Sequence, residues 1–465
     1  MKCNKIFARR FSPNKHRRLG PGAFIGCFII AASFCMAFQP YLKSPLAISN
    51  LQQSMGKGLR LVLGDEASSG SIPQPKGIHK ETEPPCKVLE RTSDYCDING
   101  DVRIHGRSST VFVASAPPSK TETPGMMNQS WTIQPYARKG DPAAMKEVTK
   151  FSVNLDQPLP DCTINHSIPA VVFSLRGYAG NLFHDFTDTI IPLYMTSQRF
   201  NGEVQFIVTN MSPRWVSKFH GILTKLSNYK PITIDGEEQI HCFPGMNLGL
   251  YRWNGRELNI DAKKSSHSMT DFRDFLRHAY SLNKTTATRI STGRHRQQPR
   301  MLIISRQRSR KFMNEPDIAT MARKLGFDVM TMEAASNVSR FAWVVNSCDV
   351  LIGVHGAGLT NMVFLPKRAV VIQVVPLGLE WIAKFDFEKP AEEMNLRYLE
   401  YRIRENESTL GERYPNEHRV FRDPSLIRKM GWDAFKSVYL EKQDVKLDVG
   451  RFRATLSEAL KLLHW

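Results

Sequence analysis

The chain has 465 residues, 42% of them hydrophobic and 10% aromatic, so it can bury a sizeable core and is not a disordered protein. Its formal net charge of +19 would suit a nucleic-acid-binding protein, but seven basic residues precede the first apolar segment and no acidic residue occurs before Asp65. The position of the charge therefore indicates a targeting tail, and we expect no nucleic-acid partner.

The first apolar segment, residues 19–38, contains no charged residue. A helix of this length spans about 30 Å, enough to cross a bilayer. Because the basic flank lies on its N-terminal side, we expect a cytoplasmic tail at residues 1–18, a transmembrane signal anchor at 19–42 and a lumenal body, which is a single-pass type II topology. A cleaved signal peptide is the alternative, although no A-x-A site follows. The short span suits a thin early-secretory membrane, and we expect Golgi residence.

The lumenal body carries two further signs of the secretory pathway. N-glycosylation sequons occur only after the expected anchor, at Asn128, Asn165, Asn210, Asn283, Asn337 and Asn406. Five cysteines also follow it, in a compartment where disulfides form. We expect Cys86 to pair with Cys96 because they are close in sequence, and Cys162 to pair with Cys242. Cys348 is interpreted as a buried free thiol.

Residues 43–85 are rich in Ser, Gly, Pro and Lys, which is typical of a flexible stem. Short strands with turn residues between them follow up to about residue 157, including 101–105 and 110–113. Strands and helices then alternate. The expected strands are 170–175, 204–208, 301–304, 327–332, 350–354 and 369–375. The expected helices are 180–200, interrupted near Pro192, then 213–226, 316–325, 338–346 and one that begins near Leu359.

This alternation predicts an α/β protein whose parallel sheets are covered by helices on both faces. A polar, basic linker at about 283–300 separates two such series. We therefore expect two Rossmann-like domains facing a cleft, one at 86–290 and one at 291–465 that ends in helices. Ligands of such sheets bind beyond the carboxyl ends of the strands.

A strand-to-helix turn after residue 354 is the first candidate binding site. Its sequence is His355, Gly356, Ala357, Gly358, Leu359, Thr360 and Asn361. Small residues let backbone amides approach an anion, and a helix N-terminus adds partial positive charge, so a diphosphate would fit. The dinucleotide fingerprint G-x-G-x-x-G is not met, because Asn361 stands where its last Gly would be, and a P-loop lacks its G-K-[ST].

A basic run from Arg289 to Lys311, without an acidic residue, is the second candidate. Arg306 and Arg310 follow the strand 301–304, where a loop would face the cleft. Two guanidinium groups could bind a leaving diphosphate without a metal, since they match phosphate oxygens bidentately. We interpret Arg294 to Arg300 as a solvated linker.

The third candidate follows the strand 170–175. His184 and Asp188 are one helical turn apart, so the carboxylate can orient the imidazole as a general base for a sugar hydroxyl. For Asp185, capping of the helix start is the competing role. We find no D-x-D between hydrophobic strands, no H-E-x-x-H and no C-x-x-C, so no metal or other cofactor is expected.

Together these blocks resemble glycosyltransferase family 61 over nearly the whole lumenal body. The matching residues include Gly180-Asn-Leu-Phe-His184 with Asp188, Ser305-Arg306 with Arg310, His355 to Asn361, Pro376-Leu-Gly378 with Trp381, Tyr398 with Glu400-Tyr401, and Arg451-Phe-Arg453. The later blocks are similar to the plant branch that decorates xylan.

The resemblance implies a GT-B-type fold, metal-independent chemistry and inversion at the anomeric carbon. Such Golgi enzymes transfer xylosyl or arabinofuranosyl units from UDP-xylose or UDP-arabinofuranose to the β-1,4-xylan backbone, and a complex with other xylan-synthesis enzymes is a further expectation. The base would be His184 or Asp188. Arg306, Arg310 and the turn His355 to Asn361 would bind the donor, with Glu380 and Trp381 shaping the sugar pocket. The alternatives are an N-glycan β-1,2-xylosyltransferase and a non-catalytic lumenal glycan-binding subunit.

Overall fold

A computed structural model describes residues 85–88, 92–114, 130–155, 158–252, 258–290, 297–334 and 337–464. Glu81–Trp465 form one compact unit. The expected tail, anchor and stem, apart from the last stem residue, lie outside the described residues, as does Asn128. Within the described part, no helix is both long enough and apolar enough to cross a membrane.

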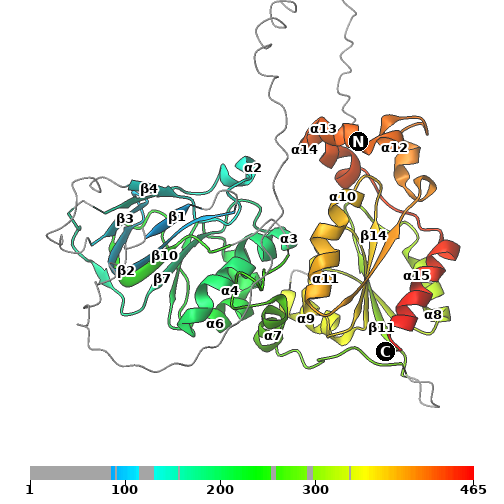
Figure 1. The fold of residues 1–465 in the computed structure, drawn as a ribbon, viewed down its shortest axis with the longest axis horizontal. Helices are drawn as coiled ribbons and strands as arrows, with labels where there is room; N and C mark the ends of the chain where they lie inside the picture. Colours follow the sequence, from blue (N-terminus) through cyan, green and yellow to red (C-terminus); the bar gives the residue numbers. More distant parts are fainter. Residues whose placement is uncertain are drawn as a thin grey trace, which may run out of the picture. The chain divides into compact units, whose positions relative to one another are not determined.

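The first of two β-sheets is mixed (Figure 1). Its strands are β1 (Cys86–Val88), β2 (Asp94–His105), β3 (Thr110–Val113), β4 (Ser130–Ile133), β5 (Phe151–Asn154), β6 (Ile164–Asn165), β7 (Ala170–Ser174), β8 (Gln205–Thr209), β9 (Ile232–Thr233) and β10 (Ile240–Leu248). They lie in the order β4-β5-β3-β2-β10-β7-β8-β9, with β1 on β2 and β6 on β10.

Only part of this sheet is parallel, so the Rossmann-like domain expected at 86–290 is wrong for its first strands. Strands β7, β8 and β9 are parallel neighbours, and β10 is parallel to β7 but antiparallel to β2. Strands β2 and β3 are antiparallel because the short turn between them cannot make the crossover that parallel neighbours need. Every residue of β7 and β8 is buried, as in strands covered on both faces.

The helical segments of this half are short. They are α2 (Pro142–Met145), α3 (Leu182–His184), the π-helix η2 (Asp185–Ile190), α4 (Ile191–Ser197), the 3-10 helix η3 (Gln198–Phe200), α5 (Pro213–Lys218), α6 (His220–Leu226) and α7 (Met269–Ala279). The helix expected at 180–200 thus begins at Leu182 and contains a π turn before Pro192. Proline has no N–H to donate, and the turn before it widens so that the Ile191 N–H bonds to the Phe186 carbonyl five residues back.

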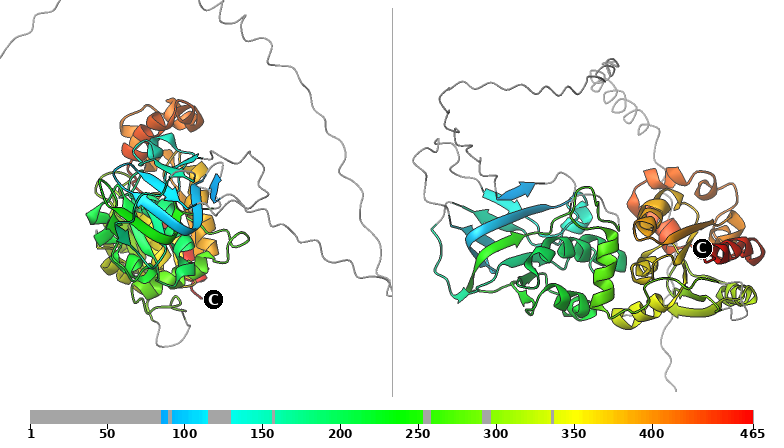
Figure 2. Two further views of the ribbon diagram at one scale, coloured as in Figure 1. Left: turned by 90° about the vertical axis from the view of Figure 1, so that its left-hand side faces the viewer. Right: turned by 60° about the horizontal axis from the view of Figure 1, so that its bottom comes forward.

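The second sheet is entirely parallel, as the alternating pattern predicts. It contains β11 (Arg300–Ser305), β12 (Asp328–Glu333), β13 (Val350–Val354), β14 (Val370–Val375) and β15 (Arg397–Arg402), in the order β12-β11-β13-β14-β15. Helices α8 (Glu315–Lys324) and α15 (Val449–Leu462) cover one face, and α9 (Val338–Ser347), α10 (Glu380–Ala383) and α11 (Lys389–Glu393) cover the other (Figures 1 and 2).

The remaining segments are η4 (Ala357–Phe364), η5 (Lys384–Glu388), η6 (Glu405–Glu407), η7 (Thr409–Glu412), α12 (Arg419–Arg422), α13 (Pro424–Lys429), α14 (Trp432–Phe435) and η8 (Lys436–Glu441). Segment η4 is the helix expected near Leu359. It is a 3-10 helix that begins two residues earlier. Segments η5 and η8 are π-helices.

The strand order places a switch point beside β11. The chain passes from β11 to β12 on one side, and the next strand, β13, pairs with the other side of β11. The loops that leave β11 and β13 therefore diverge at their carboxyl ends, where doubly wound sheets bind ligands. These two loops contain Arg306, Arg310 and the turn from His355 to Asn361.

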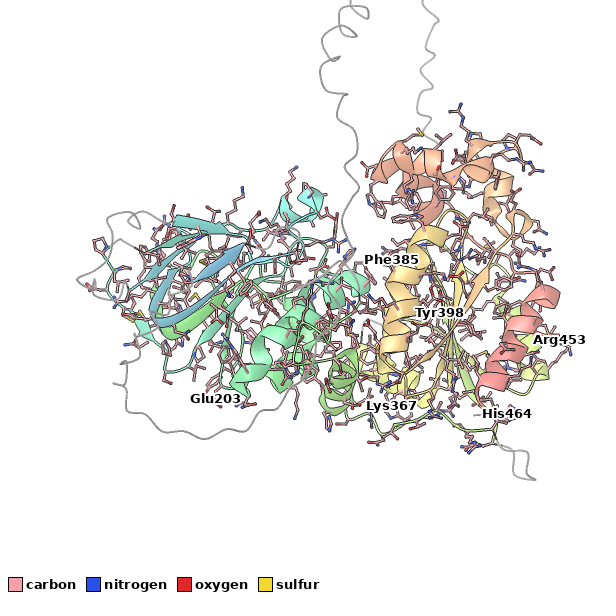
Figure 3. All side chains as sticks on the ribbon, viewed as in Figure 1. Glu203, Lys367, Phe385, Tyr398, Arg453 and His464 are labelled. Atoms are coloured by element: carbon pink, nitrogen blue, oxygen red, sulfur yellow. A yellow bond between two sulfur atoms is a disulfide. The ribbon has the colours of Figure 1, made fainter. Side chains whose placement is uncertain are left out.

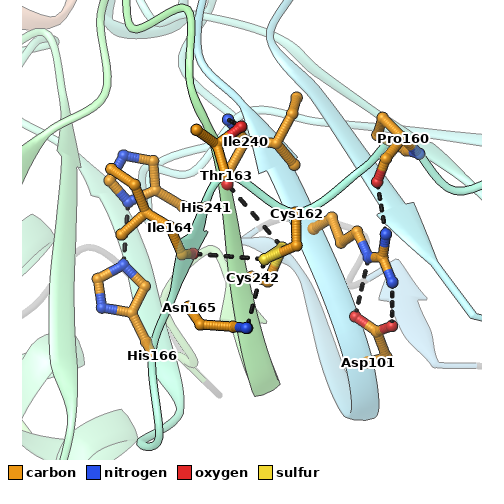
Figure 4. The surroundings of a disulfide bond; sticks show 11 residues. Asp101, Pro160, Cys162, Thr163, Ile164, Asn165, His166, Ile240, His241 and Cys242 are labelled. Atoms are coloured by element: carbon orange, nitrogen blue, oxygen red, sulfur yellow. Dashed lines mark hydrogen bonds and ion pairs between the residues drawn. A yellow bond between two sulfur atoms is a disulfide. The ribbon is translucent and has the colours of Figure 1, made fainter.

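Two disulfides join Cys86 to Cys96 and Cys162 to Cys242, the two pairs that the sequence suggested. The second links the chain before β6 to β10 (Figure 4). Cys348 is a free, buried thiol.

Candidate active site

A glycine turn at the end of β13 forms the floor of the candidate donor site. Gly356 has φ +143°, a conformation that side chains rarely adopt. An added Cβ would stand 2.6 Å from Arg310 Nη1 and 3.1 Å from Arg306 Nη1. The two guanidinium groups therefore converge on the space over Gly356, which only a residue without a side chain leaves open.

The rest of the turn is held by its own packing. Leu359 is buried and contacts Gly353 in β13, so its side chain belongs to the core. Asn361 donates from Nδ2 to the Gly358 carbonyl at 2.8 Å and braces the 3-10 helix. Thr360 is buried, and its hydroxyl has no hydrogen-bond partner among the described residues. All of these residues were predicted from the sequence to bind the donor, and in the structure they form one turn.

Arg306 and Arg310 are both half-buried in the loop after β11. Arg306 donates from Nε to the Ser309 carbonyl at 2.8 Å, and Arg310 donates from Nη1 to the His355 carbonyl at 2.8 Å. Arg310 also has a positive φ of 55°, which is uncommon for a residue with a side chain. Its Nε is buried without a partner in the described part of the chain.

The electrostatics of these arginines favour an anion. Within the described residues, no carboxylate lies within 4.0 Å of either guanidinium, although Arg306 is attracted at longer range by Asp444 and Glu333. Burial, with the like charge of Arg306, lowers the pKa of Arg310 to about 9. A bound diphosphate would supply the missing negative charge and accept hydrogen bonds from both forks.

His355 belongs to a buried hydrogen-bond chain that crosses the sheet. Gln373 on β14 donates from Nε2 to His355 Nδ1 at 2.7 Å, and the Tyr398 hydroxyl on β15 donates to Gln373 Oε1 at 2.7 Å. With Nδ1 accepting, the imidazole proton lies on Nε2, 3.7 Å from Asp386 Oδ2. Burial, then the charges of Arg310 and Arg306, lower the pKa of His355 to about 3. The ring is therefore a neutral hydrogen-bond donor.

Sequence reasoning gave no role to Gln373. A signal was available, because Gln373 is the one polar residue in the otherwise apolar β14, and a polar side chain inside a buried strand needs a partner.

The candidate base, His184, is oriented by a buried carboxylate. Asp188 Oδ2 lies 3.0 Å from His184 Nδ1. Asp188 also accepts from the Tyr136 hydroxyl at 3.0 Å, from Arg138 Nη1 at 3.0 Å and from the Thr187 hydroxyl at 2.8 Å. With these partners and no exposed surface, Asp188 is an orienting group, and the imidazole, whose side chain is 17% exposed, is the group a substrate can reach.

The protonation states fit this division. Burial alone would raise the pKa of Asp188, but the hydrogen bond with His184 and the charge of Arg138 outweigh it, so its pKa lies below the usual value. The Asp188 carboxylate accepts a hydrogen bond from His184 Nδ1–H. This arrangement leaves the Nε2 lone pair free to take a proton from a hydroxyl.

Asp185 has the structural role that was its alternative. It accepts from the Gly180 N–H at 2.7 Å, from Trp215 Nε1 at 2.8 Å and from Lys218 Nζ at 2.9 Å. It is fully buried, and it ties the start of α3 to α5.

The two halves of the site meet through aromatic contacts. Phe387 in η5 lies with its ring centroid 5.4 Å from that of His355 and 5.8 Å from that of Phe183. Phe183 in turn contacts His184 at 5.7 Å. The candidate base and the candidate donor site are therefore neighbours across one aromatic layer, although they are 171 residues apart in sequence.

The sequons differ in accessibility. Asn165, Asn283, Asn337 and Asn406 are exposed. Asn210 is half-buried, and its side-chain amide is already hydrogen-bonded, because it accepts from the Ser174 hydroxyl at 2.8 Å and donates to the Thr149 hydroxyl at 2.9 Å.

No group of three His, Cys, Asp or Glu side chains is arranged as metal ligands in the part of the chain that is described.

Comparison of the sequence with known proteins identifies the family to which the chain belongs. The glycosyltransferase 61 model matches residues 182–372, a range that begins at α3 and includes the candidate base and the turn at Gly356. The chain is 44% identical over 393 residues to alpha-1,3-arabinosyltransferase XAT3 of Oryza sativa subsp. japonica, covering 83% of this chain and 66% of that protein. It is 41% identical to beta-1,2-xylosyltransferase XYXT1 of the same plant, covering 82% of this chain and 84% of that protein.

A third relative, xylan glycosyltransferase MUCI21 of Arabidopsis thaliana, is 32% identical over 449 residues, which cover 92% of this chain and 89% of the relative. The chain spans just under two thirds of the length of XAT3 and most of the length of the other two. Identity at this level over this length, with the family's matched region on the site, shows that the chain belongs to glycosyltransferase family 61.

Proposed function

We propose that this protein is an inverting glycosyltransferase that moves a xylosyl or arabinofuranosyl unit from a UDP-sugar to the β-1,4-xylan backbone. Two relatives are named for these two pentoses and a third for xylan. The observation that supports the proposal best is the convergence of Arg306 and Arg310 over Gly356 without a carboxylate partner in the described residues.

The donor's diphosphate would lie over Gly356. There it would accept hydrogen bonds from the two guanidinium groups and from the backbone amides at the start of η4. His355 would contribute through its carbonyl, which accepts a hydrogen bond from Arg310 and holds that guanidinium in place. These positive and polar groups would stabilise the negative charge that develops on UDP as its bond to the sugar breaks. The proposal requires no metal.

The acceptor reaction would use His184. Its Nε2 takes the proton of a xylan hydroxyl, the hydroxyl oxygen bonds to the anomeric carbon, and the bond from that carbon to UDP breaks with its electron pair leaving on UDP. A single displacement inverts the anomeric centre and needs one base. Asp188 keeps the imidazole in the tautomer that has Nε2 free.

The setting is also a proposal. A GT-B-like arrangement, with the donor on the parallel second half and the acceptor on the mixed first half, agrees with the parallel second sheet and its switch point. A type II anchor in the Golgi membrane agrees with the basic, then apolar, N-terminal sequence and with two disulfides in the body. Assembly with other xylan-synthesis enzymes stays a prediction.

The test is transfer by the purified full-length protein in detergent. UDP-xylose, UDP-arabinofuranose and UDP-glucose are each incubated with β-1,4-xylo-oligosaccharides, and the product mass, linkage and anomeric configuration are determined. We expect one pentose to be transferred with inversion. His184→Ala is the matched control, because it removes the base while leaving the donor site intact. Transfer with retention of configuration, or equal rates for His184→Ala and the natural protein, would refute the mechanism.

A further inference from the structure

An aromatic surface lies next to the proposed site. Eight large apolar side chains are exposed in the described part of the chain, and five of them fall between residues 381 and 432. Three of the five are aromatic, and we call Trp381, Phe385 and Trp432 the aromatic patch. They are 44%, 57% and 53% exposed. Exposed apolar groups concentrated in this way usually mark a binding surface.

The patch begins at the reaction site. Phe385 is followed by Asp386, whose carboxylate lies 3.7 Å from His355 Nε2, and then by Phe387, which contacts both His355 and Phe183. Figure 3 shows Phe385 on the side of its helical segment that faces away from β14. Phe385 therefore lies on the helical segment that borders the site.

The patch continues away from the site along one helix face. Trp381 lies four residues before Phe385, one helical turn away. The Trp381 ring meets the Phe435 ring edge to face at 6.0 Å, and the Trp432 ring stacks on the same Phe435 ring at 5.6 Å. The three exposed rings thus lead from the helical segment beside the site to α14.

The base of this path is rigid. A Cβ added at Gly378, just before α10, would stand 2.7 Å from the Tyr439 ring, so α10 and η8 are packed closely. The Arg428 guanidinium lies 4.9 Å from the Trp381 ring centroid and holds the indole in place. A platform whose rings are already ordered loses little entropy when it binds a ligand.

The charges around the patch favour an uncharged partner. Segment η5 and its flanks carry Glu380, Lys384, Asp386, Glu388 and Lys389, and α13 and α14 carry Arg428, Lys429 and Asp433, so charges of both signs surround the patch. An anionic lipid surface or a nucleic acid would select for a field of one sign. A neutral polysaccharide matches this surface, because the apolar face of each sugar ring can stack on an aromatic side chain and its hydroxyls can hydrogen-bond to the charged groups of both signs.

We propose that the aromatic patch binds the acceptor glycan at sugar units beyond the one that receives the transferred pentose. The inference rests on the proposed function, since it assigns the acceptor of that same site. It predicts that long acceptors bind through the patch and that short ones do not reach it.

The test uses the full-length protein in detergent and two measurements. The first is direct affinity for a long xylo-oligosaccharide and for xylobiose in the absence of donor, which does not depend on catalysis. Changing Trp381 and Phe385 together to Ala should weaken binding of the long chain about tenfold or more and leave that of xylobiose within about twofold. Trp343→Ala is the matched control, because Trp343 is 60% exposed on α9, outside the patch.

The second measurement is the KM for the same acceptors in the transfer assay, where the same variant should raise the KM of the long acceptor alone. Phe385→Tyr, which keeps an aromatic ring, should retain more of the long-chain affinity than Phe385→Ala. UDP affinity should be unchanged in all variants.

The outcomes separate this inference from the proposed function. Equal affinity of the patch variant and the natural protein for the long chain overturns the inference, as does an equal loss for both acceptors. A change in oligomeric state by light scattering, with glycan affinity unchanged, would assign the patch to a protein partner and also overturn it. Absence of transfer by the natural protein with any UDP-pentose would instead count against the proposed function, while the affinity measurement would still decide the role of the patch.

Discussion

Gly356→Ala should disable the donor site without touching a charged residue. The new methyl group would stand 2.6 Å from Arg310 Nη1, closer than carbon and nitrogen tolerate, and 3.1 Å from Arg306 Nη1. Because Arg310 is also held by its bond to the His355 carbonyl, its guanidinium must swing away and lose that bond. Loss of one charge-assisted interaction with the diphosphate costs about 1.5–3 kcal/mol, so the Kd for UDP should rise by about 10- to 150-fold.

The backbone strain of an alanine at positive φ needs a separate control. Gly326→Ala provides it, because Gly326 has φ +102° and no atom within 4 Å of an added Cβ. Both variants should lose about 1–3 kcal/mol of unfolding free energy in urea titrations. Only Gly356→Ala should lose UDP affinity, measured by isothermal titration calorimetry.

A double-mutant cycle tests the route of the effect. If Gly356→Ala acts by displacing the guanidinium, it should add little to the loss of affinity once Arg310 is already changed to Ala. Fully additive losses, or equal UDP affinity of Gly356→Ala and Gly326→Ala, would refute the assignment of the two arginines to the donor site.

Three further predictions concern catalysis and stability. Asp188→Asn should lower kcat by about 10²- to 10⁴-fold with UDP affinity within about twofold, since it removes the acceptor that fixes the tautomer of the base; an unchanged kcat would contradict that role. His355 has a pKa of about 3 in the folded protein and about 6.5 in the unfolded chain. As the pH falls below 6.5, the unfolded chain therefore binds a proton at His355 that the folded protein does not. Protonation of this one residue should lower the free energy of unfolding by about 2 kcal/mol between pH 7 and pH 5. His355→Asn should remove that part of the pH dependence in urea titrations, whereas the exposed control His220→Asn should not, and equal slopes would exclude the buried neutral imidazole. Changing Cys162 and Cys242 to Ser opens a link across 80 residues and should lower the free energy of unfolding by up to about 4.5 kcal/mol, with an unchanged urea midpoint as the contrary result.

Local sequence determined most of the second half of the fold. The strands β11, β13 and β14 are short apolar runs flanked by polar segments, and such runs form buried parallel strands wherever helices alternate with them. The turn at Gly356 could also be predicted, because glycines between an expected strand and an expected helix are typical of a tight turn. His184 and Asp188 could be paired because helical spacing alone places them on one face.

Tertiary structure decided what spacing could not. The mixed first sheet depends on which partner each strand finds: β2 pairs with β10 and β3 with β5, and pairing between distant segments leaves no periodic signal in either strand. The surroundings of the two carboxylates near His184 come from residues far away in sequence: Tyr136 and Arg138 donate to Asp188, and Trp215 donates to Asp185. The contact between Arg310 and Gly356 likewise depends on the strand order. Arg310 lies in the loop after β11 and Gly356 in the loop after β13, and only the folded sheet brings these two loops together.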